Sequence, residues 1–152
     1  MKAYVLAGVI LAAVMAHPAA AMTVGNCPDA MEEKAETAVD HIKTWPQLLD
    51  WYRNYLPCDN GAPAEGVSDD VAKLLAYHWG GLGRTRTALL TDPDFAGFVL
   101  GHIDATWDDK EFMPAMFNVG TKCPSDLTAF CANALVAIKA AKAESEQVIT
   151  KP

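Results

Sequence analysis

Basic residues are scarce in this sequence. The chain holds 12 lysines and arginines against 19 aspartates and glutamates, and its formal net charge is −7. Nucleic acids and anionic membrane surfaces are bound through positively charged faces, so this balance argues against either as a partner. A protein partner, if there is one, would carry a basic surface that an acidic face attracts. Solubility alone is the simpler explanation of the same charge.

The common signatures of catalytic and cofactor sites are also missing. The sequence contains no P-loop, no G-x-G-x-x-G, no H-E-x-x-H, no C-x-x-C-H and no G-x-S-x-G nucleophile elbow. It contains no C-x2-C pair either, which zinc sites usually have. We therefore predict no cofactor and no metal, and an enzyme is the less favoured class of protein.

A second long hydrophobic run is missing as well. The one extended apolar stretch runs from Ala3 to Ala16, after Lys2 and before the small residues that end at Ala21. This order is typical of a secretory signal peptide, residues 1–21, and the apolar part is too short to span a bilayer. We predict cleavage near Ala21 and a periplasmic or secreted location. The mature helical domain, residues 22–152, would not be embedded in a membrane.

The cysteines are few and even in number: Cys27, Cys58, Cys123 and Cys131. In an exported chain this count favours disulfides. Four cysteines allow three pairings, and the short separation of Cys123 and Cys131 favours that pair, which leaves Cys27 with Cys58. Loop entropy predicts about 2.5 kcal/mol of stabilisation from the short loop and about 3.5 kcal/mol from the long one.

Apolar residues recur at helical spacing along most of the chain, and no stretch shows sustained strand-like alternation. The clearest helix follows a predicted cap at Ser68, whereas residues 58–67 are predicted to be a loop because they contain Gly61, Pro63 and Gly66. Asp92 and Pro93 predict a helix start, and Pro114 predicts a kink or a delayed start. Further helices are expected over 28–42, 46–56, 85–91 and 93–103, in the segment with the apolar face Phe112, Met113, Met116 and Phe117, and from Pro124 to about residue 144. The fold class predicted is all-α, a single compact bundle of about six helices tied by two disulfides.

Two runs, CDNGAPAEGVSDDVAKLLAYHW and DPDFAGFVLGHIDAT, resemble a family of small exported bacterial proteins. Its pattern is Cys-Asp-x-Gly, Ala-Glu-Gly, Ser-Asp, His-Trp and His-Ile-Asp-Ala-Thr, and no biochemical function is assigned to it. The resemblance covers about Cys58 to Thr106. Asn60 and Pro63 depart from the pattern, which has Asp and an aliphatic or aromatic residue there. In format alone, the chain is similar to periplasmic immunity proteins that block type VI secretion effectors.

The candidate binding residues are acids, histidines and one tryptophan: Asp59, Glu65, Asp69, His78, His102, Asp104 and Trp107. A histidine beside a carboxylate suits a general base or a metal ligand, so a hydrolase or metal site would need the two histidines to converge with Glu65 and Asp104. The structural alternative makes the acids turn residues and the histidines hydrogen-bonded core residues. No nucleophile is marked, because Ser68 and Ser125 fit helix caps. Gly61 comes too early for a calcium loop.

Two tryptophans are candidate surface anchors. Trp51 lies off the apolar stripe of its helix and Trp107 lies in a polar turn; core packing is favoured for both, and a surface contact is the alternative. Together these features favour an exported binding protein, for example an immunity or inhibitor factor that covers a basic cleft with an acidic face. One alternative is a small hydrolase or metal-binding protein with a His/carboxylate cluster. The other is a structural or stress-related protein without a dedicated ligand, which would lack a sizeable pocket or apolar patch.

Overall fold

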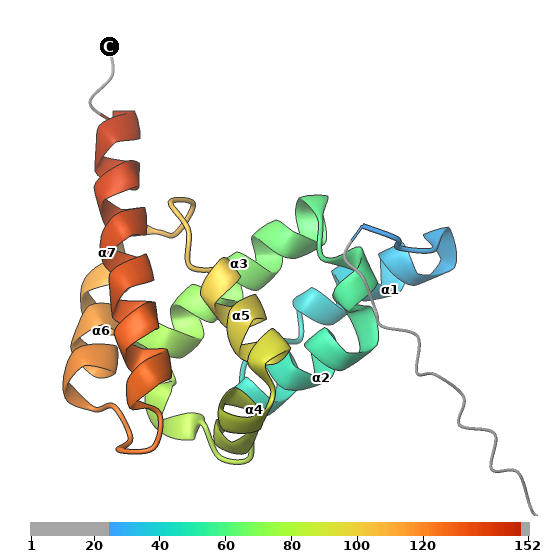
Figure 1. The fold of residues 1–152 in the computed structure, drawn as a ribbon. Coiled ribbons are helices and arrows are strands. Elements are labelled where there is room, and N and C mark those ends of the chain that lie inside the picture. The colour runs from blue at the N-terminus through green and yellow to red at the C-terminus, as the bar shows by residue number, and fades with distance from the viewer. Residues whose placement is uncertain (1–24, 150–152) are drawn as a thin grey trace, which may run out of the picture.

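The computed structural model of the chain describes residues 25–149, with side chains as far as Gln147. The described residues form seven α-helices and two short 3-10 helices and contain no strand. In chain order these are α1 (Asp29–Val39), α2 (Trp45–Tyr55), η1 (Leu56–Cys58), α3 (Gly61–Tyr77), η2 (Trp79–Gly81), α4 (Thr85–Thr91), α5 (Pro93–Gly101), α6 (Asp109–Thr121) and α7 (Thr128–Ile149). The all-α prediction is confirmed, with one α-helix more than expected (Figure 1). The predicted signal peptide and its cleavage site lie outside the described residues.

Helix α3 occupies the middle of the molecule. It packs against α6 and also against α1 and α2, while α7 packs against α5 and α6. Figure 1 shows α6 and α7 side by side at one end of the molecule and α1 and α2 at the other. The largest wholly buried side chains join these helices into one core: Trp45, Leu48, Leu75, Phe95, Phe112 and Ile138. Burying each such side chain contributes roughly 1.5–3 kcal/mol.

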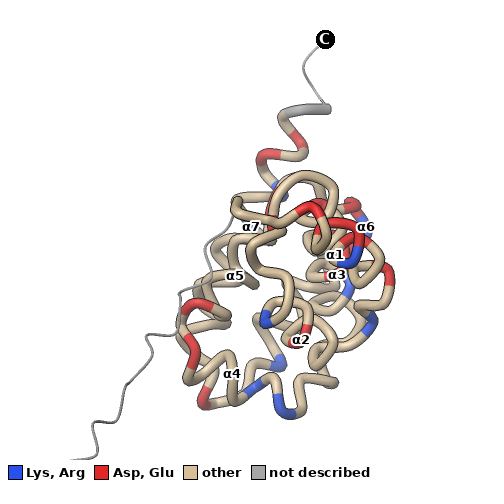
Figure 2. The backbone as a smooth tube through the Cα atoms, turned by 90° about the vertical axis from the view of Figure 1, so that its right-hand side faces the viewer, with Lys and Arg blue, Asp and Glu red and all other residues tan. Residues whose placement is uncertain are grey.

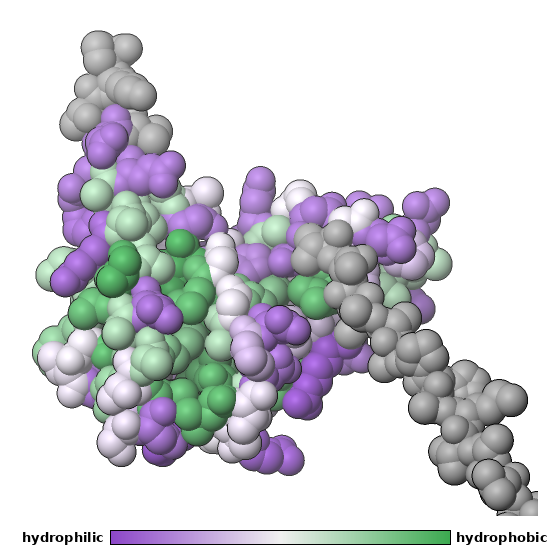
Figure 3. Space-filling model, in the orientation of Figure 1, coloured by the Kyte–Doolittle hydropathy of each residue, from purple (hydrophilic) through white to green (hydrophobic). Residues whose placement is uncertain are grey.

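The surface differs between the two ends. Figure 3 shows apolar surface gathered over α5 and α7 and mainly hydrophilic surface at the α1 end. Within residues 25–149, no helix combines the length and the apolar composition that a bilayer crossing requires.

The predicted loop over residues 58–67 is wrong, because α3 begins at Gly61 and Ser68 lies inside it rather than at its cap. Gly61 has a φ of +52°, which glycine adopts readily. Pro63 is in the first turn, where a missing N–H breaks no helical hydrogen bond. Gly66 is required by packing, since a Cβ there would lie 2.5 Å from Val39 Cγ1 of α1. Residues typical of a turn therefore serve a helix start and a close contact between helices.

The other predicted helix starts have mixed outcomes. The start at Asp92 is confirmed, because Phe95 N donates to Asp92 Oδ1 over 3.0 Å. The last helix begins at Thr128, so the predicted start at 124–125 is too early. Helix α6 starts at Asp109 and continues through Pro114, so its start is not delayed.

Both predicted disulfides are confirmed. Cys27 pairs with Cys58 and Cys123 pairs with Cys131, with Cα–Cα distances of 4.5 and 6.2 Å, and no cysteine is free. The first bond ties the segment before α1 to η1. The second ties the α6–α7 loop to the first turn of α7. Two disulfides fit an exported protein, because such bonds persist in oxidising compartments.

Trp51, predicted as a candidate surface aromatic, lies in the core with an exposed fraction of 2 %. Its Nε1 donates to the Ala35 carbonyl over 3.1 Å, and its ring stacks on Phe98 with centroids 6.0 Å apart. Helices α1 and α5 therefore cover the side of α2 that carries Trp51. The apolar stripe of α2 alone does not reveal these contacts.

Candidate functional site

Three of the predicted polar residues converge, together with one that was assigned another role. Ser68 Oγ lies 2.9 Å from His102 Nδ1 and 2.8 Å from Asp104 Oδ2. His102 Nε2 lies 3.1 Å from Asp59 Oδ1 and 3.2 Å from Asp59 Oδ2. We call Asp59, Ser68, His102 and Asp104 the Ser68 network. It joins the end of η1, the middle of α3 and the end of α5.

The network contains the Ser, His and Asp of a hydrolase triad, but its surroundings do not suit the chemistry of a triad. Ser68 has one hydroxyl proton and faces both His102 Nδ1 and Asp104 Oδ2, and the tautomer of His102 decides which of the two accepts it. Ser68 is 4 % exposed and His102 is 7 % exposed, which leaves no approach for a substrate. The nucleophile would also need free N–H donors for an oxyanion, whereas Ser68 sits within the hydrogen-bonded turns of α3. The network therefore acts as a polar junction between helices.

The remaining predicted polar residues lie outside the network. Glu65 and Asp69 are exposed on α3, and Asp69 pairs with Lys73 one turn further on. His78 is exposed at the end of α3, and its carbonyl accepts from Trp45 Nε1 over 3.0 Å. No hydrogen bond or ion pair between described residues joins Glu65 or His78 to the network. No group of three or more His, Cys, Asp and Glu within residues 25–149 is placed to hold a metal ion.

Trp107 is buried, so the favoured core packing is confirmed and the alternative of a surface anchor is wrong. It is 4 % exposed, its ring lies 5.5 Å from that of Phe112, and its Nε1 donates to the His102 carbonyl over 2.9 Å. Trp107 thus supports the Ser68 network from the core side and offers no surface to a partner.

A groove that sequence reasoning missed lies at the other end of α3. One cavity of about 670 Å³ is lined by Ala76, Tyr77, Trp79, Gly80, Leu82, Gly83, Arg86, Asn118, Lys122 and Pro124. A second cavity of about 270 Å³ is lined by Lys43, Thr44, Trp45, Tyr77, His78, Gly80 and Gly81. The two cavities share Tyr77 and Gly80, and we call them together the Tyr77 groove. In the sequence, only the glycines at positions 80, 81 and 83 mark this place, and they do not reveal which side chains line it.

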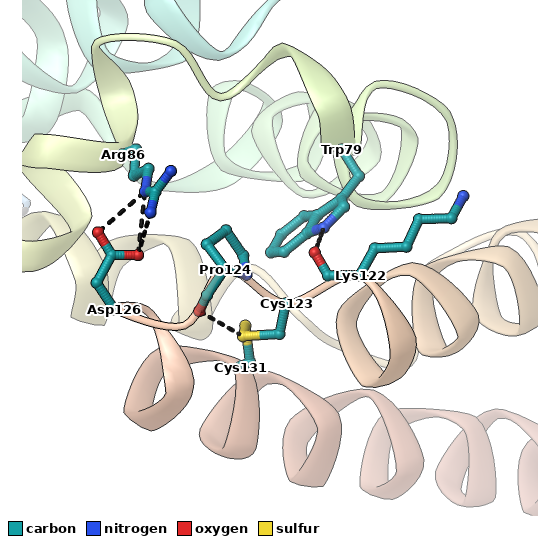
Figure 4. Close-up of a disulfide and its surroundings, with 7 residues drawn as sticks. All are labelled: Trp79, Arg86, Lys122, Cys123, Pro124, Asp126 and Cys131. Carbon is teal, nitrogen blue, oxygen red and sulfur yellow. Dashed lines mark hydrogen bonds and ion pairs between the residues drawn. A yellow bond between two sulfur atoms is a disulfide. The ribbon is translucent and has the colours of Figure 1, made fainter.

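The walls of the Tyr77 groove are held by hydrogen bonds between distant segments. Trp79 Nε1 donates to the Lys122 carbonyl over 2.9 Å, which ties η2 to the α6–α7 loop (Figure 4). Arg86 of α4 pairs with Asp126 of the same loop, close to the Cys123–Cys131 disulfide. Asn118 Nδ2 donates to two carbonyls in the last turn of α3, over 3.1 and 2.8 Å. The groove is therefore preformed by fixed elements.

The charge of this groove is opposite to that of the chain. Lys43, His78, Arg86 and Lys122 line the two cavities, and no aspartate or glutamate is among the described residues that line them. Figure 2 shows several basic residues around α2 and α4, with acidic residues on neighbouring parts of the tube. A different cavity of about 580 Å³, beside the α5–α6 loop, is lined by Asp69, Asp108 and Asp109 and has the expected acidic character.

Large apolar side chains are exposed beside the groove. Tyr77, Met113 and Phe117 are 51, 62 and 58 % exposed, and we call them the α6 patch. The Tyr77 hydroxyl donates to the Lys110 carbonyl of α6 over 3.4 Å, and Lys122 Nζ lies 5.1 Å from the Phe117 ring centre. The predicted apolar face of α6 is thus divided, because only Phe112 is fully buried. Tyr, Phe and Met are residue types enriched in protein interfaces.

Two buried carboxylates lie near these sites. Burial raises the pKa of Asp70 to about 6, against the opposing charges of Lys43, whose Nζ is 3.8 Å away, and Lys73. Burial also raises the pKa of Glu111, with the charge of Lys110 opposing, and neither carboxylate oxygen of Glu111 has a hydrogen-bond partner. Both groups are less stable in their charged form than in water.

Comparisons with protein-family models, curated proteins and solved structures gave no match to this chain. The family resemblance therefore stays a prediction. The geometry does give its pattern a physical meaning, because the Asp, Ser, His and Asp of that pattern are the four members of the Ser68 network. Thr106, also in the pattern, donates its N–H to Asp104 over 2.8 Å. In this chain, these residues form a hydrogen-bonded junction between helices.

Proposed function

We propose that this protein is an exported helical binding protein that recognises another protein through the Tyr77 groove and the α6 patch. The observation that carries the proposal is the exposure of Tyr77, Met113 and Phe117, each more than half exposed, beside a preformed cavity of about 670 Å³. Exposed aromatic and methionine side chains around a hollow are typical of interface centres. A groove with fixed walls also loses little conformational entropy on binding.

The alternatives formed from the sequence are less well supported. A structural or stress-related protein without a ligand would lack a sizeable pocket and an apolar patch, and this chain has both. A hydrolase or metal-binding protein would need an accessible His/carboxylate cluster, whereas His102 and Ser68 are buried. An immunity or inhibitor role remains one form of the proposed binding function.

A partner with a basic surface remains part of the proposal. Helix α1 and its C-cap present five exposed carboxylates: Asp29, Glu32, Glu33, Glu36 and Asp40. None of these five makes an ion pair with another described residue. They would attract a basic partner over a distance and raise its association rate, more than they would set its final affinity.

The test is site-specific photo-crosslinking in cells that make the protein. A photoreactive side chain at Phe117 is expected to give a discrete adduct with one protein, because this position is in the α6 patch. The same side chain at Val136 of α7, which is 69 % exposed, is the matched control. Unlabelled wild-type protein is expected to compete for the adduct, and a Phe117→Asp variant is not. Equal adducts at both positions, or none at Phe117, would remove the proposal.

A further inference from the structure

We infer that the Tyr77 groove binds an acidic segment of the partner, in which carboxylates alternate with apolar side chains. This inference rests on the proposed function and adds the chemistry of the segment that enters the groove. It starts from the reversal of charge, since a chain with a net charge of −7 lines both cavities with lysine, arginine and histidine and with no carboxylate of a described residue.

The two lysines of the groove are available to a ligand. Lys122 Nζ donates to Asn118 Oδ1 over 2.9 Å and has no carboxylate partner among the described residues. Lys43 is 66 % exposed, and the one carboxylate of a described residue within 4 Å of it, that of Asp70, lies 3.8 Å away and is almost fully buried. Each ammonium group therefore keeps unused donors toward solvent.

Arg86 is held in place but not used up. Its Nε and Nη2 donate to Asp126, and Nη1 takes no part in that pair. The guanidinium group therefore keeps a donor at the α4 side of the larger cavity. A rim pair of this kind is exposed and weak, so an incoming carboxylate can share the guanidinium group without a large loss.

The positions of these charges match an extended segment. Lys122 lines only the larger cavity and Lys43 only the smaller one, while Tyr77 and Gly80 line both. The two lysines therefore line different cavities, and the residues common to both, Tyr77 and Gly80, form what we call the shared middle. Trp79 and Leu82, which are 4 and 5 % exposed, supply an apolar floor in the larger cavity. A segment with acidic groups at both ends and an apolar side chain between them would pair with the two lysines and contact the apolar floor.

A basic segment does not fit the same groove. It would bring like charges against Lys43, Arg86 and Lys122, and like charges in contact oppose association. The acidic helix α1 can still attract a basic region elsewhere on the partner, because it is a separate surface from the groove.

Gly80 provides a way to block the groove without disturbing the fold. A Cβ placed on Gly80 would meet no atom within 4 Å, and its φ is not in the left-handed region. A larger side chain there would enter the shared middle of the groove. Gly97 of α5 also has open space around a Cβ and does not line the groove, so it is the matched control.

The experiment titrates the whole mature chain with two labelled peptides and follows fluorescence anisotropy. One peptide alternates glutamate with leucine, and the other alternates lysine with leucine. The glutamate peptide is expected to bind saturably, and the Lys43→Glu/Lys122→Glu variant to weaken this binding by roughly tenfold or more. Lys139→Glu, an exposed change on α7, is expected to leave it unchanged. Gly80→Leu is expected to abolish binding, and Gly97→Leu is not.

The outcomes separate this inference from the proposed function. The assignment of an acidic segment to the groove is wrong if the lysine peptide binds as well as the glutamate peptide. It is also wrong if the charge-reversed variant binds the glutamate peptide normally. The same holds if wild-type protein does not bind the glutamate peptide. A discrete adduct at Phe117 together with any of these results would keep the binding function and reject only this assignment. Circular dichroism of each variant confirms that the fold is retained.

Discussion

Replacing Asp70 by asparagine is expected to stabilise the protein at neutral pH. Asp70 lies on α3, is 5 % exposed, and has Lys43 Nζ at 3.8 Å as its only ion-pair partner among the described residues. Burial raises its pKa from 3.8 to about 6, because the low-polarity surroundings disfavour the charged carboxylate more than the lysines favour it. Asparagine has nearly the same shape and carries no charge.

The size of the effect follows from this pKa. The folded protein binds the Asp70 proton more tightly than the unfolded chain does by about two pH units, which corresponds to about 3 kcal/mol. The contribution of this group to stability is therefore fully present below pH 3.8 and is lost as the pH rises through about 6. We expect Asp70→Asn to raise the free energy of unfolding at neutral pH by about 1–3 kcal/mol and to change it little in acid.

Urea unfolding followed by circular dichroism, at several pH values from acid to neutral, measures this effect. The difference in unfolding free energy between wild type and variant isolates Asp70 from other titrating groups. Asp69→Asn is the control, since Asp69 is exposed on the same helix and pairs with Lys73. A variant that is less stable than wild type at neutral pH, or a difference that does not grow as the pH rises, would refute the reasoning.

Three further predictions concern the core and the Ser68 network. Glu111→Gln is expected to raise stability at neutral pH, because the buried carboxylate has no hydrogen-bond partner and its pKa is raised; urea unfolding that shows a loss at neutral pH would contradict this. Ser68→Ala is expected to lower the free energy of unfolding by about 1–3 kcal/mol, since it leaves buried His102 and half-buried Asp104 without the hydroxyl that joins them; an unchanged melting temperature would argue against the junction. Gly66→Ala is expected to lower the free energy of unfolding by about 1–3 kcal/mol, because the new Cβ would clash with Val39. Gly97→Ala, with open space around the Cβ, is expected to raise it by about 0.5–1 kcal/mol. Equal effects from the two variants would show that the α1–α3 contact does not limit residue 66.

The candidate site could be predicted only in part. Asp59, His102 and Asp104 were candidates because of their residue types, and they do converge. Their fourth member, Ser68, was assigned to a helix cap because the sequence places it just before an amphipathic stripe. Nothing in the sequence indicated that α3 begins seven residues earlier, at Gly61. The contact between Ser68 and His102 was therefore missed.

The Tyr77 groove could not be found from the sequence. Its lining comes from the ends of α2, α3 and α6 and from η2 and α4, which meet only after the helices pack. The exposure of Met113 and Phe117, one helical turn apart on α6, likewise depends on which side of α6 faces α3 and α7. Periodicity predicted one apolar face and did not show that part of it stays in solvent.

What the sequence determined by itself is the set of features that act over one helical turn or one short loop. The 3.6-residue spacing determined the all-α class, Asp92 and Pro93 determined the start of α5, and the cysteine separations favoured the pairing that formed. Only the tertiary structure decided that Gly66 must make room for Val39, that Trp51 and Trp107 are buried, and that a basic groove opens on an acidic protein. The physical reason is that burial and local charge belong to the contact between two segments, and neither segment carries that information alone.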